Sequence, residues 1–166
     1  MIKAIVYTSN TGYTAEYARL LGKKTGLPVY SLDKAIKELA ENEEIIYLGW
    51  LMAAFVKGLP QAVKHFSVKI VCGVCMGESG TQLDTVRKNN AILEETPIFT
   101  LQGGFDMKKL KQPYKFMMKL MAKHLKKQIA QKEAPTEEDK KVINMLDNGA
   151  SYVSEEALIP VIQLIK

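Results

Sequence analysis

The sequence has little cysteine, a single tryptophan and no long apolar run. Only two of its 166 residues are cysteines, too few for a disulfide scaffold, which favours a reducing compartment. No run of about 18 or more apolar residues occurs, so no transmembrane helix is predicted. The beginning of the chain also lacks the basic, apolar and small-residue segments of a secretion signal. We therefore expect a cytoplasmic protein.

The composition is that of an ordinary globular protein. Hydrophobic residues make up 47% of the chain and charged residues 25%. A length of 166 residues suits one domain with a sizeable core, so we expect a single domain over residues 1–166. The net charge of +5 favours an anionic partner and carries no information about the fold.

Apolar runs rich in β-branched residues alternate with helical stretches through the first 102 residues. The predicted strands are 2–8, 28–32, 44–50, 68–75 and 97–102. A helix follows the first strand over 15–26, and another spans 33–41 with Asp33 as its N-cap. Because helices separate successive strands, we predict an α/β fold with a parallel sheet that is covered on both faces.

Residues 103–153 form an insert in which helices, and no strand, are predicted. Pro113 is well placed as the first residue of a helix over 113–131. A second insert helix has Thr136 as its N-cap and stops at residues 148–149, an Asn-Gly pair.

The final helix is predicted over residues 154–166, with Ser154 as its cap. Pro160 falls beyond the first turn of that helix, where its missing N–H and its ring disturb helical hydrogen bonding. The proline therefore predicts a kink or a later start.

The polar stretch "TSNTGYT" (8–14) lies between the first strand and the first helix, where α/β folds bind phosphate. No lysine follows Gly12, which excludes a triphosphate loop of the Walker type, and a single glycine excludes a dinucleotide fingerprint. A loop of hydroxyls and backbone N–H groups at a helix N-terminus remains, and such a loop holds a phosphate monoester without a metal. The alternative is a polar turn with an N-cap and no ligand.

This stretch resembles the FMN-phosphate loop of flavodoxins, and the resemblance covers residues 1 to about 104 and the last helix. It implies a flavodoxin-like three-layer α/β/α sandwich with strand order 2-1-3-4-5 and FMN at the carboxyl ends of the strands. The first loop would hold the phosphate, and the segments 49–54 and 75–80 would flank the isoalloxazine ring. The cofactor-binding residues implied are Thr8, Ser9, Asn10, Thr11, Gly12, Tyr13, Thr14, Gly49, Trp50, Leu51, Met52, Ala53, Cys75, Met76, Gly77 and Glu78.

A second resemblance concerns the insert. The residues "GGFDMKKLKQPYKFMMKLMAKH" (103–124) resemble the corresponding part of flavodoxin-domain proteins related to menaquinone-dependent protoporphyrinogen dehydrogenase. Much of the insert after His124 does not match that enzyme. The resemblance implies an FMN oxidoreductase with a bulky or quinone-linked substrate.

Trp50 and the two cysteines are further candidates. Trp50 is placed either to stack on the flavin or to pack in the core beneath the helix that starts near Gly58. Cys72 and Cys75 form a C-x-x-C pattern, but residues three apart in a strand point to opposite faces. We predict a buried Cys72, with Cys75 at the flavin pocket. No metal site is predicted, and no catalytic residue is assigned.

The helix over 113–131 has an apolar face and a lysine face. The apolar face comprises Tyr114, Met117, Met118, Met121 and Leu125, and the lysine face comprises Lys115, Lys119, Lys123 and Lys126. One interpretation is a structural cover whose lysines are solvated. The other is a peripheral contact with an anionic membrane or an acidic partner, helped by Phe116 beside the lysines.

Three classes of function fit the sequence. The favoured one is an FMN oxidoreductase, because the insert places bulk beside the fifth strand and the chain is basic. The second is a flavodoxin-type electron carrier, which docks on redox proteins and has no substrate of its own. The third is a binding module without cofactor. The expected partner is a redox protein or a quinone, and no nucleic acid is expected.

Overall fold

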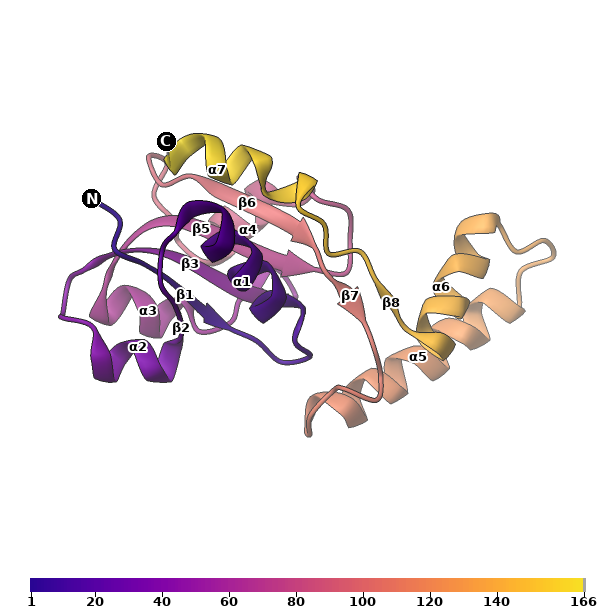
Figure 1. Ribbon diagram of the computed structural model, residues 1–166. Helices are drawn as coiled ribbons and strands as arrows, with labels where there is room; N and C mark the ends of the chain where they lie inside the picture. Colours follow the sequence, from indigo (N-terminus) through magenta and orange to yellow (C-terminus); the bar gives the residue numbers. More distant parts are fainter. Residues whose placement is uncertain (166) are drawn as a thin grey trace.

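The computed structural model describes residues 1–165 and contains a parallel sheet of five strands (Figure 1). In spatial order these strands are β2 (Val29–Ser31), β1 (Ala4–Thr8), β3 (Glu44–Met52), β5 (Ser67–Cys75) and β6 (Ile98–Gln102). All four neighbouring pairs are parallel. The order matches the predicted 2-1-3-4-5, so the chain has the flavodoxin-like fold.

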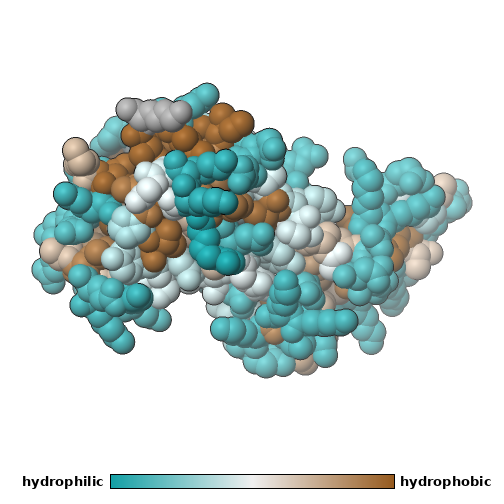
Figure 2. All heavy atoms as spheres, in the orientation of Figure 1, coloured by the Kyte–Doolittle hydropathy of each residue, from teal (hydrophilic) through white to brown (hydrophobic). Residues whose placement is uncertain are grey.

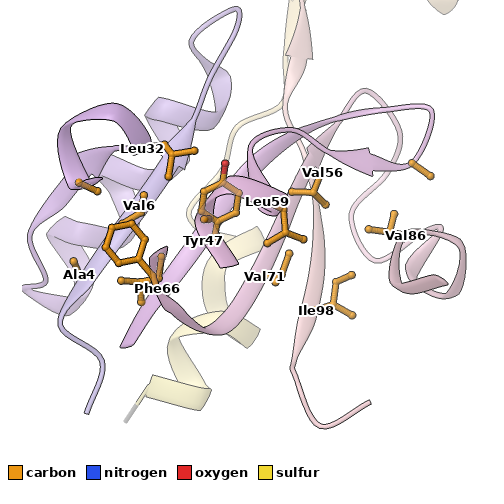
Figure 3. Close-up of a cluster of buried hydrophobic side chains, with 14 residues drawn as sticks. Ala4, Val6, Leu32, Tyr47, Val56, Leu59, Phe66, Val71, Val86 and Ile98 are labelled. Atoms are coloured by element: carbon orange, nitrogen blue, oxygen red, sulfur yellow. The ribbon is translucent and has the colours of Figure 1, made fainter. Parts of the chain in front are cut away.

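Helices cover both faces of the sheet because its strands are apolar on both sides. One layer consists of α2 (Leu32–Glu38), α3 (Leu59–His65) and α4 (Leu83–Asn89), and the other of α1 (Tyr13–Thr25) and α7 (Ile159–Ile165). Alternate residues of β1 point to opposite faces of the sheet: Val6 packs in the core under α2, α3 and α4, and Ile5 packs in the core under α1 and α7. We call these the first and the second core. Figure 3 shows the first core, with Tyr47 at its centre.

Two predicted helix starts are wrong by one or two residues. β2 ends early, so Ser31 and not Asp33 is the N-cap of α2. Pro113 is the N-cap of its helix, and Tyr114 is the first helical residue. In both cases the sequence offers suitable cap residues at neighbouring positions, and the pattern alone does not choose between them.

The final helix starts later than its cap, as one of the two alternatives for Pro160 predicted. A short 3-10 turn, η1 (Glu156–Leu158), comes first, and α7 then runs from Ile159 with Pro160 in its first turn. Ser154 does act as a cap, because its Oγ accepts the Ala157 N–H at 3.3 Å. The predicted last residue, Lys166, lies outside the described residues.

β3 is two residues longer than predicted because it continues into a hairpin. It pairs antiparallel with β4 (Phe55–Val56), and the turn residues Ala53 and Ala54 have φ of 49° and 63°. Asn90 holds this turn: its side-chain oxygen accepts the Val56 N–H at 2.8 Å, and its amide donates to Ala54 O at 2.8 Å. The segment that follows the predicted strand is therefore a fixed hairpin.

The insert is a helical arm that leaves the sheet domain (Figure 1). Its helices are α5 (Tyr114–Ala130) and α6 (Glu137–Asn148), and a capping box at Thr136 starts α6 as predicted. The prediction of no strand in the insert is wrong. β7 (Gly104–Phe105) pairs with β8 (Ala150–Ser151) at the base of the arm, and pairs this short leave no alternating pattern to detect.

The arm has a small core of its own. Phe105, Ala122 and Leu146 are buried there, and Met118 packs against them. Within residues 1–165, no helix is both long enough and apolar enough to cross a bilayer.

Candidate functional site

The candidate site lies at the carboxyl ends of β1 and β3. From β1 the chain moves to β2 on one side of the sheet, and after β3 it moves to β5 on the other. The two connections diverge at this point, which leaves the crevice where open α/β sheets bind ligands. The loop over 8–14 and the β3–β4 hairpin form its two sides.

The loop presents backbone donors at the start of α1. Glu16 is the first helical residue whose N–H has a helical acceptor, Gly12 O at 2.9 Å, so the N–H groups of residues 13–15 have no acceptor within the helix. Gly12 adopts φ 100°, a left-handed conformation that favours glycine, and its N–H donates to Ser9 Oγ at 3.1 Å. The Ser9 hydroxyl thus shapes the loop from within.

Three polar side chains at this loop have no partner. The Asn10 Nδ2 atom is buried and makes no hydrogen bond within residues 1–165. Thr11 and Thr14 also line the crevice, and their hydroxyls make no hydrogen bond to any described residue. Buried polar groups in proteins are normally paired, so the Asn10 amide indicates a polar ligand, and the two threonine hydroxyls line the same crevice.

Thr8 plays a different part from the one predicted. Its Oγ1 lies 2.7 Å from the Tyr47 hydroxyl, which also donates to Lys57 O at 2.8 Å. Burial raises the pKa of Tyr47, so this hydroxyl stays protonated. A Cβ at Gly58 would lie 2.5 Å from the same Oγ1. Thr8 is therefore turned towards β3 and α3, and it fixes the loop on the sheet.

The crevice opens into a pocket with a volume of about 520 Å³. Its polar end is the loop over 10–14, and its remaining walls come from the β3–β4 hairpin, the end of β5 and the arm. This volume is in the range of small-molecule and cofactor sites. Because apolar and aromatic side chains dominate these walls, the pocket suits a flat ligand with one charged end.

Trp50 stands in the pocket wall and belongs to none of the buried cores. Its ring meets Tyr114 of α5 edge to face, with ring centroids 5.0 Å apart. Lys57 Nζ lies 5.8 Å from the centroid of Trp50 and 6.0 Å from that of Tyr114. The alternative of a core tryptophan is therefore wrong, and the first turn of α5 closes one side of the pocket.

Most of the predicted cofactor residues are brought together. Those that line the pocket are Asn10, Thr11, Tyr13, Thr14, Trp50, Leu51, Met52, Ala53, Cys75 and Met76. Thr8, Ser9 and Gly12, together with Asn10, line an adjoining cavity of about 440 Å³ on the other side of the loop.

Three predicted residues line neither space. Gly49 is buried within β3, where a Cβ would lie 2.6 Å from Lys57 O, so it serves the packing of the hairpin. Gly77 and Glu78 lie in the exposed loop beyond β5. The chain turns away from the pocket there, and the Glu78 carbonyl accepts the Thr81 hydroxyl at 2.7 Å.

The arm contributes a set of wall residues that the sequence did not assign to the site. These are Gly104, Phe105, Leu110, Tyr114, Met117, Met118 and Met121, and Val74 of β5 was missed as well. The apolar spacing along 113–131 marks four of them as one helix face. That spacing does not show that this face lines the pocket, because the direction of the arm depends on the β7–β8 pair at its base.

Tyr13 connects the arm to the loop. A Cβ at Gly104 would lie 2.8 Å from Tyr13 Cζ, so only a glycine lets the ring pack at the base of the arm. Lys109 Nζ lies 5.3 Å from the centre of that ring. Burial, and then the negative charge of Asp106, raise the pKa of Tyr13, which keeps its hydroxyl as a donor.

The two cysteines are separated as predicted. Cys72 is fully buried in the second core, and burial raises its pKa to about 12. Cys75 is half-buried at the pocket wall; burial raises its pKa, and its thiol donates to Gly77 O at 3.4 Å. Within residues 1–165, no group of three or more histidine, cysteine or acidic side chains could hold a metal ion.

Comparisons with known proteins add little to the description of the fold and the site. No family model matches the chain, and no curated protein matches it. A solved structure described as a flavodoxin from the domain Archaea matches with a TM-score of 0.38 and 15% sequence identity, over 62% of this chain and 85% of that chain. The fold assignment given above rests on the strand order.

Proposed function

We propose that the protein binds FMN in this pocket and acts as a flavin-dependent oxidoreductase on a bulky, apolar or quinone-linked substrate. The observation that carries the proposal is the composition of the pocket. Its polar end has unpartnered donors at Asn10, Thr11 and Thr14, and its walls are aromatic and apolar. A phosphate monoester joined to a flat ring system matches both parts.

The residues of the polar end fit the FMN phosphate. The Asn10 amide, the two threonine hydroxyls and the N–H groups of residues 13–15 all offer protons, and the helix dipole of α1 adds a favourable field. Trp50 and Met76 stand on the walls that would flank the ring. Bound there, FMN would supply the redox chemistry by accepting electrons from one partner and passing them to another.

The arm supports an enzyme over an electron carrier. A carrier needs an open flavin edge for its partner protein, whereas α5 places Tyr114, Met117 and Met121 over the pocket. Methionine side chains adapt to irregular apolar ligands, which suits a bulky substrate or a quinone. A protoporphyrinogen dehydrogenase-like activity, implied by the resemblance of the insert, is one member of this class.

The charges near the pocket also favour two-electron chemistry. Lys57 lies near Trp50 and Tyr114, Lys109 lies near Tyr13, and neither lysine makes an ion pair with a described residue. Glu78, the acid expected at the ring, is outside the pocket. Positive charge stabilises the negative charge of a fully reduced flavin and so makes the second electron easier to add.

An anaerobic dithionite titration of the FMN-loaded protein separates the two classes. We expect direct conversion between the oxidised and the two-electron-reduced absorption spectra. Accumulation of a stable half-reduced flavin at the midpoint would contradict the enzyme proposal and indicate the carrier.

Reoxidation of the reduced protein tests the substrate class. We expect Met117→Gln with Met121→Gln to slow reoxidation by menadione, since these substitutions keep side-chain length and remove apolar surface. Ferricyanide, a small hydrophilic oxidant, should react at the wild-type rate and serves as the control. Equal rates with menadione would mean that the arm does not guide the substrate.

A further inference from the structure

We infer that the outer face of α5 docks on an anionic lipid bilayer. The inference concerns a surface that extends beyond the flavin pocket, and it goes beyond the proposed redox function. It rests on the charge of the arm, on apolar side chains that the fold leaves exposed, and on the position of both beside the pocket mouth.

The α5 region is strongly basic. Between residues 107 and 132 there are nine lysines and no acidic residue: Lys108, Lys109, Lys111, Lys115, Lys119, Lys123, Lys126, Lys127 and Lys132. Lys126 pairs with Asp147, and Lys132 with Asp139. The other seven make no ion pair within residues 1–165. This surface therefore attracts anions and repels a second copy of itself.

Apolar side chains on the same helix are exposed. Leu120 is 56% exposed and Phe116 63%, and Met117, Met121 and Leu125 are exposed as well. The buried residues of α5, Ala122 and Ile129, lie on the side of the helix away from Phe116 and Leu120. Residues 116, 117, 120 and 121 therefore form a continuous exposed strip, which we call the α5 strip.

The lysines border the α5 strip. Lys119, Lys123 and Lys127 recur every four residues and form a row along one edge of it. Figure 1 shows α6 alongside α5, so α6 covers one side of the helix and leaves another free. In Figure 2 hydrophilic residues dominate the visible face of the arm. An apolar strip with a lysine border is the pattern of helices that lie in a membrane interface.

The position of the strip favours a bilayer over an acidic protein. Met117 and Met121 belong both to the strip and to the pocket wall. Docking of the strip would therefore bring the pocket mouth to the lipid, and an apolar substrate could pass between the two without crossing water. This last step alone rests on the proposed function.

Vesicle sedimentation tests the docking. We expect wild-type protein to bind phosphatidylcholine vesicles that contain phosphatidylserine, with binding lost at high salt, and to ignore pure phosphatidylcholine. Lys119→Glu with Lys123→Glu should weaken binding at least about 25-fold, because each lysine near an anionic surface is worth about fivefold. FMN content, measured in parallel, should not change.

Two matched variants make the test specific. Lys64→Glu with Lys88→Glu changes the net charge by the same amount, at exposed positions of α3 and α4. Because salt screens charges that lie away from the bilayer, this variant should bind vesicles within about twofold of the wild type. Phe116→Ser with Leu120→Ser spares the pocket wall and should weaken binding about tenfold or more, because it removes inserted apolar surface.

Three results would overturn the inference. Wild-type protein that ignores anionic vesicles at low salt has no such docking surface. An equal loss in the Lys64/Lys88 variant would show that net charge, and not the α5 strip, drives binding. Binding that survives Phe116→Ser with Leu120→Ser would be purely electrostatic, and the α5 strip would then not insert into the bilayer.

Discussion

Removal of the two threonine hydroxyls from the polar end of the pocket should weaken FMN binding selectively. Thr11 and Thr14 line the pocket, and their hydroxyls have no partner among the described residues. Thr14 is only 2% exposed, so valine, which keeps the branched shape, is the better replacement there. The variant is Thr11→Ala with Thr14→Val, and Thr11→Ser with Thr14→Ser is the control that keeps both hydroxyls.

The expected magnitude follows from the charge of the phosphate. A hydrogen bond to a charged group contributes about 1.5–3 kcal/mol, so two of them contribute about 3–6 kcal/mol. At about 1.4 kcal/mol for each factor of ten, FMN affinity should fall by about 10² to 10⁴. Binding should not vanish, because Asn10 and the N–H groups at the start of α1 remain.

Calorimetric titration of the apoprotein with FMN and with riboflavin measures this effect. Riboflavin lacks the phosphate, so its affinity should be nearly the same in all variants. An equal loss for both ligands, or unchanged FMN affinity in the variant, would refute the assignment of the loop to the phosphate.

Two further predictions concern the framework of the site. Asn90→Ala should lower the free energy of unfolding by about 2–3 kcal/mol, because it leaves the Val56 N–H and the Ala54 carbonyl of the hairpin without their partner. Urea unfolding measures this free energy. The control is Asn89→Ala, which loses only an exposed bond of 3.5 Å to Ala53 O and should change the free energy by less than about 0.5 kcal/mol. Equal effects of the two substitutions would show that Asn90 does not hold the hairpin. The second prediction concerns pH, because burial raises the Cys72 pKa from an ordinary value of 9.0 to about 12. Above pH 9 the unfolded state loses the thiol proton that the folded state keeps. The contribution of Cys72 to the free energy of unfolding is therefore complete below pH 9 and should fall by about 1.4 kcal/mol per pH unit above it. Urea unfolding of wild type and Cys72→Ala across this range should give curves that converge as the pH rises, and parallel curves would mean that Cys72 does not contribute.

The parallel sheet could be predicted from the sequence because each strand leaves a strong local signal. The run at the start of the chain is apolar on both faces, as β1 requires, and the same holds for β5. The loop after β1 could also be placed, because Gly12 and its polar neighbours follow a strand and precede a helix. These features depend on residues close together in the chain.

The rest of the pocket depends on contacts between distant residues. The β3–β4 hairpin needs Asn90, which is more than thirty positions away and has no turn signature of its own. Tyr114 reaches Trp50 only because β7 and β8 pair at the base of the arm. Glu78 was expected at the ring because it follows β5, but the chain there turns outward. Sequence periodicity identifies an apolar face on α5 and does not say which neighbour covers it.

FMN binding is the central claim, and the visible spectrum of the purified protein tests it most directly. We expect the absorption bands of a flavin, either as isolated or after incubation with FMN. The cofactor released on denaturation should be FMN and not FAD. A protein that is colourless and stays colourless after incubation with FMN would contradict the account.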